Sequence, residues 1–546
     1  MKGIHGWPAG YVVAATAACG VAAAAAAQEG DLLYNGIRLP AEWPPKDRPV
    51  SYEPMDVPYL ASPPDVIPID VGRQLFVDDF LVAETNLQRT HHKAAYWPGN
   101  PVLAPDKPWE NKTPSAGHPA PTAMPFSDGV FYDPQDGVFK MWYMAGYTDA
   151  TAYAVSRDGI YWDKPILDVV EGTNLVDTTP RDSGTVWLDL VENDPAKRYK
   201  MILYVHDANR RLALSFSPDG IHWTPAPTVG RPLGDRTTFF YNAFRKVWVY
   251  DLRDYARDGI GRYRRYREAV DIEKGLEPTD VSPPFWMGAD RLDPQRADLE
   301  TPCELYNHDA VAYESVLIGL FAIWRGQPKD RAKPNELCIG YSRDGFHWDR
   351  PMREAFIPVS ETYGDWNWAN VQSAGGCCLV VKDQLYFYVS GRRGVPGSTA
   401  SGVCATGLAT LRRDGFASMD AGTTEGALLT RPVKFSGKFL FVNVDAPSGE
   451  LRVEVCGRDG KVIEPFTRNA CVPVKIDSCL HQVQWNGGGD LSALAGKPVR
   501  FRFHLRNGSL YAFWVSPDAS GASHGYVAAG GPGFTGLTDT VGKEAM

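Results

Sequence analysis

The chain has 546 residues, 44% of them apolar and 22% charged, and this balance excludes a disordered chain and a single small module. A chain of this length is expected to form two or more hydrophobic cores. The 56 Lys and Arg residues against 65 Asp and Glu residues give a net charge of −9 with no basic stripe, so nucleic acid is not an expected partner.

Turn-forming and aromatic residues are both abundant. The sequence has 53 Gly and 43 Pro together with 16 Trp, 25 Tyr and 23 Phe. Glycine and proline favour turns and aromatic side chains favour strands, so the mixture predicts many short strands rather than helices. We therefore expect an all-β protein.

The N-terminal segment, residues 1–27, has the pattern of an export signal. Lys2 precedes an apolar run that ends in Ala25-Ala26-Ala27, a small-residue cleavage site. A membrane anchor is the alternative, but the run is short and rich in alanine, and polar residues follow it directly. The pattern predicts a secreted or periplasmic protein with no membrane span after signal removal.

Residues 28–70 are rich in proline and weakly periodic, which predicts an extended arm over the surface of the main domain. Eight cysteines follow the signal segment, none of them in a C-x-x-C pair and none beside a histidine cluster. No metal site and no cofactor are therefore predicted. Export would permit disulfides, whose pairing stays open.

A short motif recurs through the middle of the chain. Three copies of the form Ser-x-Asp-Gly-x-x-Trp lie at residues 156–162, 217–223 and 342–348. An incomplete copy, which keeps the Asp-Gly pair, lies at 412–416. The interval between the second and third copies is about twice the others, so a degenerate copy is expected at 266–271. Asp-Gly favours a tight turn in which glycine takes a positive φ, and Ser can bond the turn backbone.

Five such units of about four strands each predict a five-bladed β-propeller over residues 71–420. A β-sandwich with repeated hairpins is the alternative. After residue 420 the pattern changes to alternating strands at 451–455, 481–485 and 499–505, which predicts a C-terminal β-sandwich over 425–516. Residues 517–546, rich in Gly, Ala and Ser, are predicted to form a flexible tail.

In a propeller, polar residues near the start of each unit can meet in one central funnel. Residues 154–162 resemble the first-blade repeat of glycoside hydrolase families 32 and 43, and Arg181-Asp182-Ser183 followed by Val186-Trp187 is similar to their second-blade Arg-Asp-Pro signature. The resemblance implies a glycoside hydrolase with one acidic residue in each of three blades. These act as nucleophile or base, transition-state stabiliser and general acid.

Carried over to this chain, the resemblance implies Asp182 as the stabiliser. It implies Asp128 as the base, although the family's Asn-Asp-Pro-Asn pattern does not precede that strand. For the acid, Glu314 lies in Tyr313-Glu314-Ser315, which is similar to the family 32 Tyr-Glu-Cys motif but falls in the fourth unit. Asp235, at the start of the third unit, competes with it.

Further residues are candidates for binding a sugar. Aromatic rings can stack on sugar faces, His118 can bond hydroxyl groups, and arginines can bind an acidic sugar. Each also has a structural reading, as core packing, ion pairing or turn formation. The substrate-binding candidates are His118, Arg181, Arg236, Tyr306, Asp309, Trp366, Trp368 and Arg392.

Three functions compete. The first is an exported glycoside hydrolase that acts on a poly- or oligosaccharide containing furanose-type sugars. The second is a non-catalytic carbohydrate-binding propeller, favoured by the missing Asn-Asp-Pro-Asn pattern. The third is a sialidase-like enzyme, in which Arg181, Arg236 and Arg392 would form an arginine triad, although five units argue against it. In each case the expected partner is a carbohydrate; the oligomeric state stays open.

Overall fold

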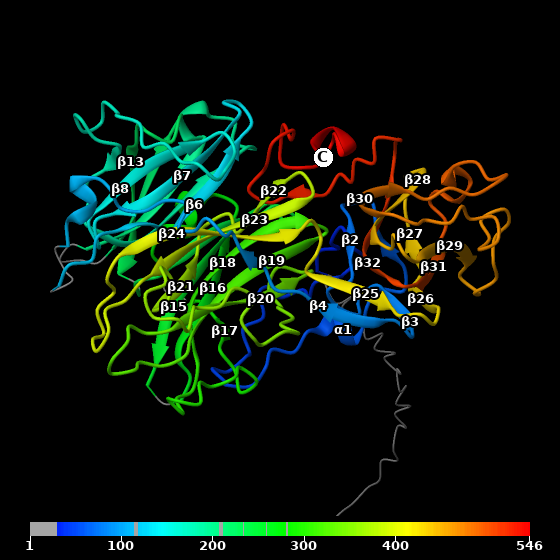
Figure 1. Ribbon diagram of the computed structural model, residues 1–546, viewed down its shortest axis with the longest axis horizontal. Coiled ribbons are helices and arrows are strands. Elements are labelled where there is room, and N and C mark those ends of the chain that lie inside the picture. The colour runs from blue at the N-terminus through cyan, green and yellow to red at the C-terminus, as the bar shows by residue number, and fades with distance from the viewer. Residues whose placement is uncertain (1–29, 114–117, 207–210, 233, 258, 280–281) are drawn as a thin grey trace, which may run out of the picture.

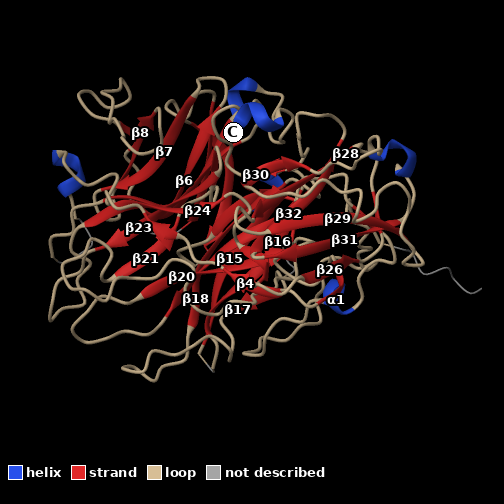
Figure 2. Ribbon diagram, turned by 45° about the vertical axis from the view of Figure 1, so that its right-hand side comes forward, coloured by secondary structure: helices blue, strands red, loops and turns tan. Residues whose placement is uncertain are grey.

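The computed structural model describes residues 30–113, 118–206, 211–232, 234–257, 259–279 and 282–546. The export signal predicted for residues 1–27 lies outside this part of the chain. The described residues form many strands and a few short helices, which confirms the expectation of a nearly all-β protein (Figure 2). No helix in these ranges is both long and apolar enough to cross a membrane. The helices are α1 (Pro58–Ala61), α2 (Ile272–Leu276) and the 3₁₀ turns η1 (Pro108–Asn111), η2 (Pro195–Lys197), η3 (Leu491–Leu494) and η4 (Gly542–Ala545).

Five antiparallel sheets make up the larger part of the molecule, and we number them in chain order. Sheet 1 consists of β6 (Ala123–Asp133), β7 (Val138–Ala145), β8 (Ala150–Ser156) and β9 (Leu175–Asp177). Sheet 2 consists of β10 (Arg181–Leu188), β11 (Tyr199–Val205), β12 (Arg211–Ser217) and β13 (Thr224–Pro232). Sheet 3 consists of β14 (Thr238–Asn242), β15 (Val247–Ala256), β16 (Gly261–Ala269) and β17 (Phe285–Gly288).

The last two of these sheets each include a strand from a distant part of the chain. Sheet 4 consists of β18 (Glu304–Glu314), β19 (Val316–Trp324), β20 (Asn335–Ser342) and the late strand β33 (Tyr526–Val527). Sheet 5 consists of β21 (Asn370–Ser373), β22 (Leu379–Val381), β23 (Gln384–Arg392), β24 (Cys404–Arg412) and the early strand β5 (Ala95–Tyr96).

The first strands of the five sheets form a closed cycle. β6 contacts β10, β10 contacts β14, β14 contacts β18, β18 contacts β21, and β21 contacts β6 again. Residues at the start of these strands can therefore come together although they are far apart in the sequence.

The repeated motif forms the turn that follows the third strand of a sheet. In sheet 1, Gly159 has φ +77°, its N–H donates to Ser156 Oγ at 2.9 Å, and Asp158 Oδ1 accepts from two further N–H groups. The copies in sheets 2 and 4 repeat this geometry, with φ +81° at Gly220 and +88° at Gly345. The degenerate copy at 266–271 lies at the end of β16, the third strand of sheet 3.

Each turn also docks on the preceding sheet. Trp142 Nε1 of sheet 1 donates to the carbonyl of Gly220 in sheet 2 at 2.7 Å. Tyr388 of sheet 5 donates to the carbonyl of Gly159 in sheet 1 at 2.5 Å, so the last sheet binds the first. A side chain at either glycine would collide with the docking residue.

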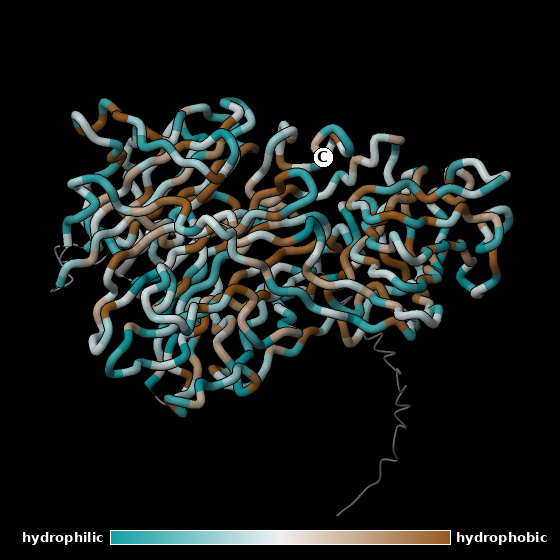
Figure 3. The backbone as a smooth tube through the Cα atoms, viewed as in Figure 1, coloured by the Kyte–Doolittle hydropathy of each residue, from teal (hydrophilic) through white to brown (hydrophobic). Residues whose placement is uncertain are grey.

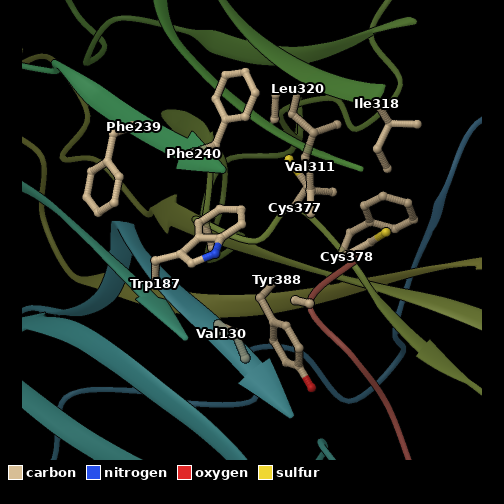
Figure 4. Packing of buried hydrophobic residues seen from close by; sticks show 14 of the residues in the cluster. Val130, Trp187, Phe239, Phe240, Val311, Ile318, Leu320, Cys377, Cys378 and Tyr388 are labelled. Atoms are coloured by element: carbon tan, nitrogen blue, oxygen red, sulfur yellow. The ribbon is translucent and has the colours of Figure 1, made fainter. Parts of the chain in front are cut away.

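One apolar core joins the five sheets. Figure 4 shows Val130, Trp187, Phe239, Val311 and Tyr388, one buried residue from each sheet, in the same region of the core. A second, separate core lies between two further sheets, so the chain has at least two cores, as its length predicts. In Figure 3 the hydrophobic segments follow the strands in both regions, whereas many loops are hydrophilic.

These two further sheets have six strands each and lie on the right in Figure 1. The first consists of β1 (Ile67–Pro68), β27 (Val433–Lys434), β31 (Val499–Arg506), β26 (Gly426–Thr430), β3 (Val82–Thr85) and β29 (Glu450–Gly457). The second consists of β30 (Asp477–Gln482), β28 (Phe439–Asp445), β32 (Gly508–Ser516), β25 (Ala417–Ala421), β4 (Gln88–His91) and β2 (Gln74–Leu75). Strands β1 to β4 precede the five sheets in the chain, whereas the sequence assigned this region to residues 425–516 alone. They have two to four residues each, too few for an alternating pattern to be read.

The C-terminal segment is packed rather than flexible, so the prediction of a flexible tail over 517–546 is wrong. β33 pairs with the end of β18, and Asp539 forms an ion pair with Arg413 at 3.1 Å. Figure 1 shows this segment between the two regions of the molecule. The glycines that suggested flexibility instead permit close backbone approach: a Cβ at Gly531 would lie 1.7 Å from the carbonyl oxygen of Val380.

Candidate active site

Two carboxylates from neighbouring sheets lie near one another at the start of the first strands. Asp182 is the second residue of β10, and Asp235 precedes β14. Oδ1 of Asp182 is buried without a hydrogen-bond partner among the described residues, whereas the Asp235 side chain is 45% exposed and lies 3.4 Å from Arg253 Nη1. Burial raises the pKa of Asp182 and the charge of Asp235 raises it further, while Arg236 lowers it.

Arg236 links this pair to the first sheet. Its N–H donates to Ser183 Oγ at 3.0 Å, and its guanidinium donates to the Phe126 carbonyl at 3.1 Å and to Ser127 Oγ at 3.0 Å. The guanidinium carbon lies 3.7 Å from the centre of the Phe126 ring. With φ +59°, Arg236 is a buried non-glycine residue in the left-handed region, a conformation that is common at functional sites.

Tyr306 and Arg392 complete the group from sheets 4 and 5. Burial raises the pKa of Tyr306, but the neighbouring cations Lys333 and Arg392 outweigh burial, so the net shift is downward. The Lys333 ammonium lies 4.8 Å from the centre of the Tyr306 ring. Arg392 donates to the hydroxyl of Tyr147 at 3.1 Å, and its guanidinium carbon lies 5.3 Å from the Phe126 ring centre. The structure thus brings predicted residues from four sheets into one cluster.

Asp128 lies next to this cluster but is enclosed. The carboxylate is fully buried and forms an ion pair with Arg181 at 2.5 Å, while Arg181 also donates to Thr151 at 3.1 Å. Burial raises the pKa of Asp128, and Arg181 lowers it. Because Arg181 is engaged in this ion pair, it is not available to bind a substrate. The structure therefore does not support the predicted triad of Arg181, Arg236 and Arg392.

Asp309 belongs to a buried polar network that joins three sheets. Its Oδ2 accepts from Ser127 Oγ at 2.9 Å, from Ser373 Oγ at 2.5 Å and from Asn307 Nδ2 at 3.1 Å. Burial raises the pKa of Asp309, while the hydroxyls of Ser373 and Ser127 and the charge of Arg236 oppose the shift. Asp309 therefore supports the strands beneath the cluster rather than facing a substrate.

Glu314 lies elsewhere, so the structure does not bring it together with the other predicted catalytic residues. Tyr306 and Glu314 are eight residues apart in the same strand β18, which corresponds to about 26 Å along an extended chain. Glu314 is fully buried, accepts from the Arg73 N–H at 3.1 Å and from Ser523 Oγ at 2.7 Å, and faces Arg413 at 3.2 Å. The similarity to the Tyr-Glu-Cys motif covers only three residues. It does not show at which end of β18 the glutamate lies.

The two tryptophans predicted as sugar platforms have structural contacts. Trp366 packs on the backbone of sheet 5, where a Cβ at Gly391 or Gly407 would lie 2.0 Å from the indole ring. The ring of Trp368 is covered by the guanidinium of Arg331 at 4.9 Å. At least one face of each ring is thus occupied, so the structure does not support either residue as an open platform.

His118 lies beside the cluster through Ser401. The Ser401 N–H donates to His118 Nε2 at 3.3 Å, and Arg392 donates to Ser401 Oγ at 3.1 Å. Sequence analysis missed Lys333 and Tyr147, which lie in loops without a recognisable pattern.

In the described ranges, no group of three or more His, Cys, Asp or Glu side chains is arranged to hold a metal ion. The eight cysteines in these ranges are buried free thiols.

No protein-family model matches this sequence. No curated protein matches it either. Similar solved structures include an N-acetylgalactosamine deacetylase from F. plautii, with 13% identity over 57% of this chain and 96% of that chain at a TM-score of 0.40. A thermostable family-43 glycoside hydrolase has 11% identity over 55% of this chain and 92% of that one at a TM-score of 0.36. An exo-β-1,3-galactanase from Phanerochaete chrysosporium has 11% identity over 78% and 99% at 0.34. At these TM-scores, the likeness does not decide what the chain does.

Proposed function

We propose that this protein is an exported glycoside hydrolase that cleaves a poly- or oligosaccharide, with Asp182 and Asp235 as its reacting carboxylates. In this proposal the five sheets are the blades of a five-bladed β-propeller. The two six-stranded sheets form a β-sandwich built from residues 67–91 and 417–516, and residues 30–66 form an arm. The closed cycle of first strands supports the propeller, and the separate second core supports the sandwich.

The observation that carries the proposal is the unequal environment of the two carboxylates. Asp182 has a buried oxygen with no hydrogen-bond partner in the described part of the chain and a raised pKa, as a proton donor to a leaving oxygen requires. Asp235 is half-exposed beside Arg253, an environment that suits an ionised carboxylate. We therefore assign Asp182 as general acid, rather than the stabiliser that the family resemblance implies, and Asp235 as base or nucleophile. Their separation in a substrate complex would decide between inversion and retention.

The test is a screen of the purified protein on polysaccharides and aryl glycosides, with arabinofuranosides and fructofuranosides among them, followed by two variants. Asp182→Asn and Asp235→Asn should each lower hydrolysis by about 10²-fold or more with the fold intact. Asp168→Asn, a change at an exposed aspartate, is the matched control and should retain full turnover. Wild-type turnover by Asp182→Asn would refute the proposal.

A non-catalytic carbohydrate-binding protein is the second candidate. The position of Glu314 favours it, because the cluster then lacks the third carboxylate of the family pattern. This candidate predicts that saccharides bind and are recovered intact after prolonged incubation. Released sugar that disappears in Asp182→Asn would exclude it.

A further inference from the structure

The cluster around Asp182 contains more positive than negative charge. Arg236, Arg392 and Lys333 form no ion pair within 4.0 Å among the residues that the structure describes, whereas nearby Arg262 pairs with Glu304 at 2.5 Å. In the described ranges these three cations thus lack an ion-pair partner, and the buried carboxylates that act on Arg236 are Asp182 and Asp309. Buried cations are costly without a compensating charge, so an anionic ligand would relieve the imbalance.

The three cations are held close together by two aromatic rings. The guanidinium carbons of Arg236 and Arg392 lie 3.7 Å and 5.3 Å from the centre of the same Phe126 ring. Lys333 lies over Tyr306 at 4.8 Å. Arg236 and Arg392 are 1% and 3% exposed, and the Nε of each has no partner in the described part of the chain. Such fixed guanidiniums are suited to an anion with several oxygen atoms.

We propose that the saccharide bound here is acidic, and that Arg392, Arg236 and Lys333 bind its carboxylate or sulfate group beside Asp182. This inference rests on the site of the proposed function and names its substrate class. It requires no metal, since the protein supplies the positive charge. Lys333 is partly exposed, whereas Arg236 and Arg392 are buried. We therefore expect an incoming anion to contact Lys333 first.

The experiment is isothermal titration of three trisaccharides of equal length: a trigalacturonate, a sulfated galactotriose and neutral galactotriose. The wild-type protein should bind one of the acidic probes at least about tenfold more tightly than the neutral one, with affinity falling as salt rises. The tighter acidic probe identifies the group as carboxylate or sulfate. Lys333→Met and Arg392→Gln should each reduce the preference at least about fivefold, whereas Arg393→Gln, a change at the exposed neighbour, should leave it unchanged.

Neither acidic probe binding more tightly than the neutral probe would overturn the inference. So would an unchanged preference in Lys333→Met, a variant chosen because its partly exposed position tolerates substitution. Asp182→Asn separates this inference from the proposed function, because it should abolish hydrolysis while retaining the acidic preference. Hydrolysis of neutral sugars without a preference for acidic ones would support the proposed function. It would refute only the inference that the substrate is acidic.

Discussion

A buried charge group at the far end of β18 gives a sharp test of the electrostatic reasoning. It contains three carboxyl groups, Glu314, Asp414 and Asp539, against two guanidiniums, Arg73 and Arg413. Every one of these side chains is fully buried. Since the acids outnumber the bases, one carboxyl is expected to hold a proton, and the perturbations that test this are Arg413→Met and Glu314→Gln.

The two substitutions should differ strongly in cost. Arg413→Met leaves three buried carboxyls with one guanidinium, and breaking a buried pair in this way costs about 3–5 kcal/mol. Burial and the nearby acids Asp414 and Asp539 raise the pKa of Glu314 against the opposing arginines, so its neutral form is favoured. Glutamine keeps that neutral state and loses the bond from Arg413, which costs about 1–2 kcal/mol.

The assay is urea unfolding, read as the shift in midpoint at constant slope. Arg458→Met is the matched control, because Arg458 is 56% exposed and forms a surface ion pair with Asp65 at 2.9 Å. Its cost should stay within about 0.5 kcal/mol. An Arg413→Met cost equal to or below that of Glu314→Gln would refute the reasoning.

The pH dependence follows from the same group, with a definite sign. The folded-state pKa of Glu314 is raised, so the folded state binds a proton that the unfolded state releases. Its contribution to stability is therefore complete below the unfolded pKa and is lost as pH rises through the folded pKa. Glu314→Gln should flatten that fall, and it should leave saccharide hydrolysis intact, because Glu314 lies away from the site.

Three further predictions concern the rest of the fold. Gly220→Ala should cost about 1–3 kcal/mol more than Gly172→Ala in urea unfolding: both have positive φ, but the new Cβ lies 2.4 Å from Trp142 only at Gly220. Burial and Asp78 raise the pKa of Asp349 to about 6, so stability should fall as pH rises through about 6, and Asp349→Asn should flatten the thermal-melting profile between pH 4 and 7. In protein lacking residues 1–29, thiol reagent should modify the eight buried cysteines only after denaturation; rapid labelling of the folded protein would contradict the packing.

The turn motif could be predicted from sequence because its chemistry is local. Asp158 and Ser156 bond N–H groups within three residues of themselves, and Gly159 supplies the positive φ that the turn needs. The regular recurrence of such turns then indicates repeated sheets. The short strands β1 to β4 carry no such signal, since they are defined by their partners in β25, β26, β27 and β32.

The candidate site could be predicted only where a residue belongs to a recognisable motif. Asp182 follows Arg181 in a family-like signature, and Asp235 and Arg236 open the third unit, so all three were found. Lys333 lies in the loop before β20, and it is the folding of the chain that brings it over the Tyr306 ring. No local sequence pattern indicates this contact. The sequence does not reveal that β18 is a single strand of 11 residues, so it could not show that Tyr306 and Glu314 lie far apart along one strand.

The two ends of β18 show why ion pairing, rather than burial, distinguishes the site. At the Glu314 end, buried Arg73 and Arg413 each face carboxylates within 3.5 Å. At the Tyr306 end, Arg236 and Arg392 are buried to a similar degree without an ion pair among the described residues. A protein retains buried charge without an ion pair at a cost to stability, and ionisable groups in such unusual environments cluster at functional sites. The end of the strand at which the buried arginines form no ion pair in the described ranges is therefore the end at which a saccharide is expected to bind.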